Sequence, residues 1–543
     1  MSRTPLTLAR PAAFTAVAAL VCGGVAMASP AVAEPVGGAF VVTSLADTSD
    51  PGTLRSALEA AEESSGDDVI TFEVTGTINI TQQLPIITNG GITITGPGSG
   101  QLTIATPPAP DTVPAFIFVP QSGGDASFSG FTITGGAATV VADFGEGESE
   151  SDAQGRFSLD DVVFDGSAHG IPAPALFVAG GSTRPDVLVS GSRIQGYSQG
   201  GETAGAVQIA EAKSVSIDDS TVDGNTSGSF GGGVLLVDVT DVQISGSTFS
   251  HNSAVSVGGG LVAIGSDAVT VTQSTFSGNH AGETGAAIVV SGSNRLSVNH
   301  STVTGNTDDG IDGSAVVAAS APVSVDSSII SGNAGASTSV PDLLIPVFQD
   351  RAIAERLAAE LPEVAAEDGS VVGKSIAPLI AAAEQEEAAP VEQTLGTVSS
   401  SLIGQPRSAF DASLWTLSPG SIFEADAQLG PLADNGGRTL THLPATTSPA
   451  IDAGDVATLD GLVVDQRLAP RVVGNSVDIG SVEVQAAGSS PAVSTPNGAA
   501  ARLPDTGAGV EMPLVALGGL LLGGVVLLGL QRVAARRRGN VGA

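Results

Sequence analysis

The chain has 543 residues, enough for several domains, and carries 56 Asp and Glu against 20 Lys and Arg, a formal net charge of −36. Such an acidic surface repels nucleic acid and anionic lipid, so we expect no nucleic-acid partner. Aromatic residues make up only 3% of the chain while Gly numbers 71, which favours short strands joined by tight turns over a conventional globular core.

Residues 1–33 have the pattern of a secretory signal peptide. Two arginines precede an apolar run, and the small residues Ala31 and Ala33 mark a cleavage site. We expect cleavage after Ala33; an uncleaved membrane anchor is the alternative. Cleavage would remove Cys22, the only cysteine, so disulfides cannot stabilise the exported chain.

Residues 52–72 begin with helical spacing and end in a strand. Leu54, Ala57, Leu58 and Ala61 fall on one face of a helix, and an amphipathic helix can cover the open end of a stack of strands. With the string GTINITQQLPIITNGGITITGPG that follows, this stretch resembles the amino-terminal cap of bacterial right-handed β-helix proteins of the pectate-lyase-like superfamily. The resemblance implies the same fold here.

Near-copies of one hexapeptide recur every 27 residues in the middle of the chain. Within each copy apolar residues lie two apart, the spacing of a strand with one buried face. The same positions stay apolar in every copy, which indicates that each copy stacks on the next. We therefore predict an all-β fold, a parallel β-helix with 27-residue rungs. The copies STVDGN, STFSHN, STFSGN, STVTGN and SIISGN end at Asn225, Asn252, Asn279, Asn306 and Asn333.

The aligned copies predict which side chains face the core. Phe276 should point inward between Phe249 and Val303, whereas Thr275 should point outward as an ordinary surface residue. The Ser and Asn positions should be structural: Asn tolerates the left-handed backbone of a sharp bend, and stacked amides can form a hydrogen-bonded ladder.

Acidic and histidine side chains in the rungs were weighed as a catalytic site. A glycosidase needs two carboxylates close together, and a polyuronate lyase needs metal-binding acids with basic residues. The acids show no adjacent pair on neighbouring rungs, and the histidines show no companion acid and no metal spacing. We therefore expect no catalytic residue, cofactor or metal. The candidates are Asp218 with Asp219, Asp238 with Asp241, Asp308 with Asp309 and Asp312, and His251, His280 and His300.

The period breaks at residues 336–395. Ile353, Leu357 and Leu361 are spaced as one helix face, so we predict a helical insertion. This face is expected to pack on the solenoid, with binding of a partner as the alternative. Residues 340–392 should be dispensable for the solenoid.

Residues 396–485 should hold returning rungs, beginning near SSSLIGQ, and a closing module. Residues 429–454 and 465–483 resemble the choice-of-anchor Q module, a closing segment of bacterial β-helix proteins that precedes various surface anchors. Arg438 and residues 461–464 depart from its pattern without changing the expected fold. Four charged residues of this part are expected to serve in turns and pairing: Asp452, Asp465, Arg467 and Asp478.

A linker at residues 486–502 leads to residues 503–543, which resemble the cell-wall sorting signal of Gram-positive surface proteins. An apolar run at 513–530 and a basic tail follow a pentapeptide, and a permanent transmembrane tail is the alternative. The resemblance implies that a sortase cuts after Thr506 and joins it to peptidoglycan, so that the chain contacts the membrane only transiently. The pentapeptide is Leu503, Pro504, Asp505, Thr506 and Gly507.

Together these segments favour an exported, cell-wall-anchored protein whose β-helix and cap occupy residues 34–335. Its expected role is non-catalytic: adhesion, binding of a glycan or host protein, or structural display. The alternative is a surface carbohydrate-active enzyme, either a glycoside hydrolase or a polysaccharide lyase, because fold alone does not fix function.

Overall fold

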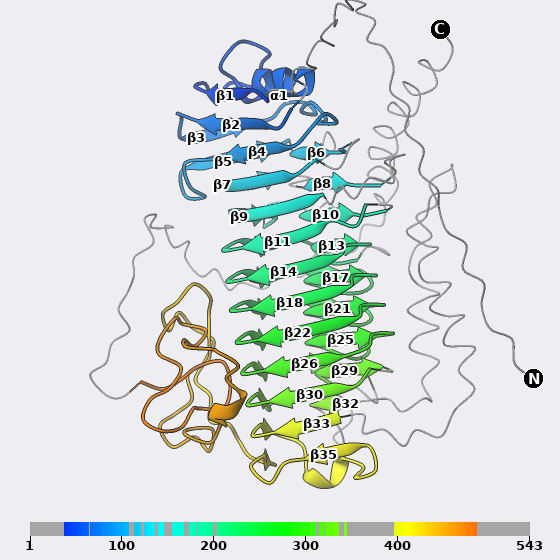
Figure 1. Cartoon of the computed structure of the whole chain (residues 1–543), viewed down its shortest axis with the longest axis vertical. Coiled ribbons are helices and arrows are strands. Elements are labelled where there is room, and N and C mark those ends of the chain that lie inside the picture. The colour runs from blue at the N-terminus through cyan, green and yellow to red at the C-terminus, as the bar shows by residue number, and fades with distance from the viewer. Residues whose placement is uncertain are drawn as a thin grey trace, which may run out of the picture.

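The computed structural model describes two stretches of the chain, which together form one long stack of short parallel strands (Figure 1). The predicted signal peptide with its cleavage site, the linker and the sorting signal lie outside the described residues. These are residues 396–485 and residues 37–344, the latter with gaps at 65, 108–112, 121–123, 136–138, 146–154, 168–172, 182, 199–203, 311–313, 320 and 336–341.

Each rung crosses three faces. The first face consists of the longer strands of a 23-stranded sheet, paired in parallel along the whole stack. Its strands are β1 (Ala39–Val42), β2 (Asp68–Phe72), β4 (Ile92–Thr95), the first half of β7 (Ala126–Gly135) and of β9 (Arg156–Asp165), β11 (Asp186–Ser190), β14 (Ser214–Asp218), β18 (Asp241–Ser245), β22 (Ala268–Thr272), β26 (Leu296–Asn299), β30 (Val323–Asp326), β33 (Gly396–Ser399) and β35 (Trp415–Leu417).

The second face belongs to the same sheet and follows the first after a sharp bend. It comprises the second halves of β7 and β9 and ten shorter strands. These are β3 (Gly76–Asn79), β5 (Leu102–Thr106), β12 (Arg193–Gln195), β15 (Thr221–Asp223), β19 (Thr248–Ser250), β23 (Thr275–Ser277), β27 (Thr302–Thr304), β31 (Ile329–Ile330), β34 (Leu402–Ile403) and β36 (Ile422–Phe423).

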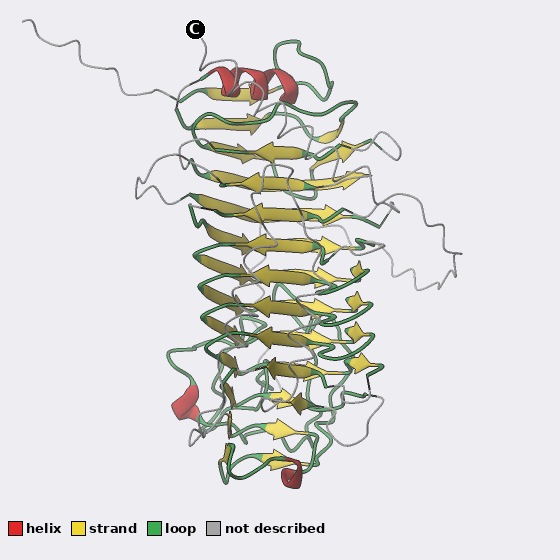
Figure 2. Cartoon of the chain, turned by 90° about the vertical axis from the view of Figure 1, so that its right-hand side faces the viewer, coloured by secondary structure: helices red, strands yellow, loops and turns green. Residues whose placement is uncertain are grey.

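A nine-stranded sheet forms the third face, and a four-stranded sheet of two-residue strands lies at the corner before it (Figure 2). The larger sheet contains β6 (Phe116–Phe118), β8 (Val140–Asp143), β10 (Leu176–Ala179), β13 (Val207–Ala210), β17 (Val234–Val237), β21 (Leu261–Ile264), β25 (Ile288–Ser291), β29 (Val316–Ala319) and β32 (Leu343–Leu344). The smaller one contains β16 (Thr226–Ser227), β20 (Ser253–Ala254), β24 (His280–Ala281) and β28 (Thr307–Asp308).

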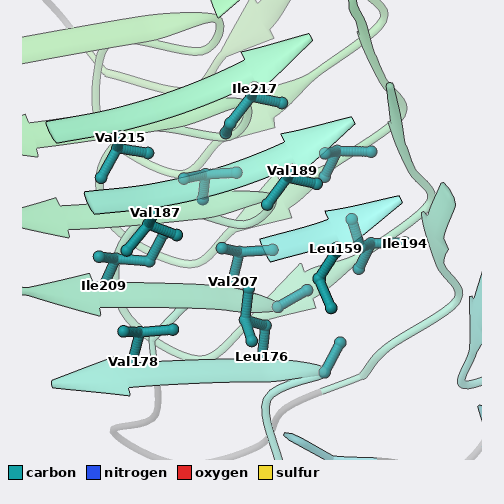
Figure 3. Close-up of a cluster of buried hydrophobic side chains, with 14 of the residues drawn as sticks. Leu159, Leu176, Val178, Val187, Val189, Ile194, Val207, Ile209, Val215 and Ile217 are labelled. Carbon is teal, nitrogen blue, oxygen red and sulfur yellow. The ribbon is translucent and has the colours of Figure 1, made fainter. Parts of the chain in front are cut away.

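The register confirms the predicted parallel β-helix. Val215 pairs with Val242, Val242 with Val269 and Val269 with Leu296, each 27 residues further along the chain. Rungs nearer the amino terminus are longer, since Phe157 pairs with Val187. Alternate side chains of each strand point into the coil, where Val and Ile from facing sheets meet (Figure 3).

Helix α1 (Leu54–Glu63) covers the amino-terminal end of the stack, as predicted (Figure 1). The Thr53 side chain caps the helix by accepting a hydrogen bond from the Ser56 N–H at 3.1 Å. The four apolar residues of the predicted helix face are all buried. Arg55, also buried, donates to Asp47 at 2.8 Å and to the backbone of the second rung, which fixes the cap to the coil.

Two ladders of identical side chains run up the bends. Each Asn side chain donates from Nδ2 to Oδ1 of the Asn one rung on, at 2.9 to 3.0 Å. Each Ser hydroxyl accepts the backbone N–H of the Ser one rung before, from Ser192 to Ser401. The expected left-handed role of Asn is wrong: the preceding residue takes it, such as Gly278 with φ 65° before Asn279. The amides face the interior and satisfy buried backbone groups.

Aromatic side chains close the other end of the stack. Trp415 occupies the inward position that Val323 and Gly396 hold in the two rungs before it. A Cβ on Gly396 would lie 2.3 Å from the indole ring, which explains why that inward position is a glycine. Phe410 packs edge-on against Trp415 and Phe423, with ring centroids 4.8 and 5.6 Å away. Three of the chain's few aromatic residues therefore seal the core.

The predicted insertion begins later than expected. Residues 342–344 lie inside the predicted range, yet β32 pairs with β29 as part of the solenoid. The remainder of that range, including the predicted helices, lies outside the described residues. The solenoid resumes in register, because β33 pairs with β30 and Ser401 continues the serine ladder from Ser328.

This register sharpens the deletion experiment. Leu344 aligns with Val317 and Gly396 with Val323, so residues 347–395 replace a connection of three residues, 320–322. Deleting 347–392 restores that length, and we expect an unchanged β-type circular dichroism spectrum and melting midpoint. Deleting 340–392, which also removes β32, should lower the midpoint. Loss of the cooperative melt in the shorter deletion would show that the removed segment completes the core.

Candidate functional site

Residues 424–485, here called the closing module, fold back along the second face of the solenoid (orange in Figure 1). Gln466 is the central contact. Its side-chain amide donates to Thr248 Oγ1 at 3.0 Å and its carbonyl oxygen accepts from Thr275 Oγ1 at 2.7 Å. Ser481 Oγ lies 3.2 Å from both Thr275 Oγ1 and Thr302 Oγ1. The module thus bonds to three consecutive rungs through their outward threonines.

The expectation that Thr275 is an ordinary surface residue is therefore wrong. Its side chain does point outward from the coil, in register with Thr248 and Thr302. The closing module covers it, however, and leaves it 0% exposed. The contact joins residues about 190 positions apart, which no comparison of neighbouring rungs can reveal.

Apolar contacts hold the lower part of the module. The outward position occupied by Thr in four rungs becomes Ile329 and then Leu402 in the next two. Both pack with Ala450 and Ile479 of the module in one buried cluster. This change is visible in the sequence, where SIISGN and SSSLIGQ replace the Thr of STFSGN, and it could have indicated the docking surface.

A buried ionic cluster lies between these two contacts. Arg471 is fully buried, and its Nη2 donates to His300 Nδ1 at 2.8 Å and to the carbonyls of Asp478 and Gly480. His300 Nε2 lies 3.1 Å from the Thr458 carbonyl, so the imidazole is neutral with its proton on Nε2. Burial, and then the charge of Arg471, lower the pKa of His300 to about 4.

The charged residues of the module have the structural roles expected of them. Asp465 forms a 2.8 Å ion pair with buried Arg467, and Asp478 accepts the backbone N–H of Asp452. Glu483 lies near Arg471, with 4.0 Å between Oε2 and Nη1, and burial raises its pKa to about 7. These contacts stabilise the module and its docking; they hold no substrate-sized space.

Removing the Thr275 hydroxyl tests the docking. Thr275→Ala should lower the free energy of unfolding by about 1–2 kcal/mol, because Gln466 loses a partner in a buried site. Thr270→Ala, on the outward and half-exposed side of the same rung, should change it by less than about 0.5 kcal/mol. Urea unfolding of both variants gives the comparison, and equal effects would contradict the docked arrangement.

Two histidines of the exposed corner do have companion acids, contrary to expectation. His251 Nδ1 lies 3.0 Å from Asp223 Oδ1, and His280 Nε2 lies 3.6 Å from Asp309 Oδ2. Burial alone would raise the pKa of Asp223, but hydrogen bonds from His251 and Ser250 together lower it. The pairs join different positions of successive rungs, so a comparison of identical positions missed them.

The candidate carboxylates are each held by neighbouring polar groups. Asp218 accepts from Ser216 and Ser245 at 2.6 and 2.5 Å, and Asp241 accepts from Gln243 at 2.7 Å. Arg438 of the closing module lies 3.5 Å from Asp219, and Arg184 lies 3.1 Å from Asp238.

Asp308 differs from the other candidates because it faces inward and is 4% exposed. Burial raises its pKa to about 6. Asp312 and the sorting residues Leu503 to Gly507 lie outside the described residues, as do Ala31 and Ala33.

Metal and membrane sites were sought in the same part of the chain. Within the described ranges, no three His, Cys, Asp or Glu side chains are grouped so that they could hold a metal ion. None of the helices in those ranges has the length and apolar character needed to cross a bilayer. The apolar run at 513–530 falls beyond them.

Comparison with known proteins agrees with the geometry. No curated protein matches the chain. Residues 117–335, which include β6 to β31, match the family described as "Right handed beta helix region". The chain therefore contains a right-handed β-helix, a fold that hosts both enzymes and binding proteins.

Proposed function

We propose that this protein is exported, attached covalently to peptidoglycan through Thr506 by a sortase, and displays its β-helix as a non-catalytic binding surface at the cell wall. Its partner would be an extracellular glycan or a host protein. The terminal motifs support the location, and the outward side of the first face supports the binding role.

The observation that carries the binding role is a continuous band of polar side chains, here called the outer band. It lies on the outward side of five successive strands spaced about 4.8 Å apart. Its hydroxyls, amides and carboxylates can bond to a polar chain that lies along the solenoid axis. The band consists of Ser216, Gln243, Thr270, Ser297 and Ser324, and beside them Asp218, Ser245, Thr272, Asn299 and Asp326.

Charge narrows the partner. The band contains carboxylates but no basic side chain, and the chain carries a net charge of −36. A polyanion such as a uronate polymer would be repelled. We therefore favour a neutral or cationic ligand rich in hydroxyl groups.

The alternative, a glycoside hydrolase on the same fold, draws support from one site. Asp308 has a raised pKa, as a general acid requires, and it is followed by exposed Asp309, which pairs with His280. Its 4% exposure leaves little access for a sugar, so we rank this candidate second.

Binding is tested with a glycan and matrix-protein array probed with residues 34–506. Wild-type protein should bind a ligand class that a variant carrying Gln243→Ala and Thr270→Ala binds at least tenfold more weakly. Ser250→Ala, on the second face, is the matched control and should bind normally. Equal binding by all three proteins would contradict a role for the outer band.

Anchoring is tested separately by Thr506→Ala in the native host. The variant should leave the wall fraction and collect in the membrane or medium, because a sortase needs the Thr carbonyl to form its acyl intermediate. Asp505→Ala, at the variable position of the motif, is the control and should remain in the wall. Normal amounts of the Thr506 variant in purified wall would contradict sorting.

A further inference from the structure

Two inward-facing carboxyl groups lie in the last corner of the small sheet. Asp308 ends β28 and pairs with Ala281, which in turn pairs with Ala254. A charged residue thus fills an inward position that small apolar residues fill in the two preceding rungs. One oxygen of Asp308 accepts the Gly310 N–H at 3.1 Å, while Oδ2 is buried without a hydrogen-bond partner.

Asp342 terminates the asparagine ladder one rung later. Its Oδ1 accepts from Asn333 Nδ2 at 3.0 Å, and Oδ2 again lacks a partner and is buried. The residue is 1% exposed and lies next to β32, after which the chain leaves the solenoid for residues 345–395. The two acids belong to adjoining rungs, since the Asp308 N–H donates to the carbonyl of Ala334 beside Asn333.

A buried carboxylate oxygen without a donor is costly when charged, and protonation removes most of that cost. Burial accordingly raises the pKa of both Asp308 and Asp342 to about 6. The charged groups facing Asp308 are Asp309, which raises its pKa further, and His280, which opposes the rise. Around Asp342 the facing groups are the amide of Asn333 and the backbone near Gly404 and Gln405, which also oppose it.

We propose that Asp308 and Asp342 make this corner a pH-sensitive clasp, which tightens the last rungs in mildly acidic surroundings and loosens them at neutral to alkaline pH. The point of control is the place where residues 345–395 leave the solenoid. This device is independent of the proposed binding role.

The sign follows from linkage. Both folded-state pKa values lie above the unfolded value of about 3.9, so the folded corner takes up protons that the open corner does not. Its stability is full below pH 4 and is lost as the pH rises through 6. Each carboxyl can change the opening equilibrium constant by about a hundredfold between pH 4 and pH 8, because the shift is about two pKa units.

Amide hydrogen exchange of the exported chain, residues 34–506, tests the proposal. After correction for intrinsic rates, protection of strands β28, β31 and β32 should fall at least tenfold from pH 5 to pH 8. Strands β17 and β18, several rungs away, should change much less. Asp342→Asn and Asp308→Ala, which restores the residue of the preceding rungs, should each reduce the pH dependence and raise protection at pH 8.

Asp309→Asn is the control, because its exposed carboxyl neighbours Asp308 but does not face the core. It should retain the wild-type pH dependence. The proposal is overturned if wild-type protection in the corner is the same at pH 5 and pH 8, or rises with pH. It is equally overturned if Asp309→Asn abolishes the dependence while the two inward variants keep it. The wild-type profile alone decides the matter should a variant fail to fold.

Discussion

Phe276→Ala should lower the free energy of unfolding by about 3–5 kcal/mol, the range for emptying a buried aromatic site. The Phe276 ring is 0% exposed and stacks on Phe249, with ring centroids 4.6 Å apart and planes within 4°. Its other neighbour in the column is Val303, one rung on. The loss should be large because both neighbours are fixed by their own strands and cannot close the cavity.

Urea unfolding measures this loss, and the first transition is the fair comparison because stacked repeats can unfold in parts. Phe276→Leu, which keeps much of the volume, should lose less than Phe276→Ala. Thr270→Ala, outward in the same rung, provides the surface reference. A Phe276→Ala variant as stable as the Thr270 variant would mean that the inward and outward assignments are reversed.

Asn279→Ala should cost a similar amount, about 3–5 kcal/mol, since several buried groups lose their partners together. Asn279 Oδ1 accepts from both the backbone and the side chain of Asn252, and Nδ2 donates to Phe249 O and Asn306 Oδ1. Its position inside the coil, 0% exposed, leaves no water to replace these bonds.

Asn294→Ala is the matched control, because Asn294 donates its amide to Asp267 in an exposed pair between the same two rungs. It should change the free energy of unfolding by less than about 0.5 kcal/mol. The same urea titration serves for both variants. An Asn279→Ala variant within 1 kcal/mol of the Asn294 control would show that the ladder contributes little, an estimate based on the usual worth of one hydrogen bond, about 1 kcal/mol.

The solenoid was predictable because its information is local and repeated. Every 27 residues the chain meets the same neighbours, so inward Phe276, the helix cap and the ladder through Asn279 could be assigned from spacing alone. Helical spacing misled the prediction only at the insertion boundary, where strand pairing holds Leu343 and Leu344 in the solenoid.

The parts that spacing could not predict depend on contacts distant in the chain or diagonal between rungs. Thr275 is buried by Gln466, and neither residue carries an apolar signal. His251 meets Asp223 across successive rungs at different positions, so identical-position comparison finds no pair. The left-handed residue before Asn279 is Gly278, the residue type with the least steric cost there.

The central claim is that the displayed solenoid binds a ligand without transforming it. The most direct measurement incubates the exported chain with the ligand that it captures from the array and analyses the ligand by mass spectrometry. The account predicts saturable binding, lost with Gln243→Ala and Thr270→Ala, and a ligand recovered at its original mass. Time-dependent cleavage of the ligand, abolished by Asp308→Asn or Asp309→Asn, would contradict it and establish an enzyme.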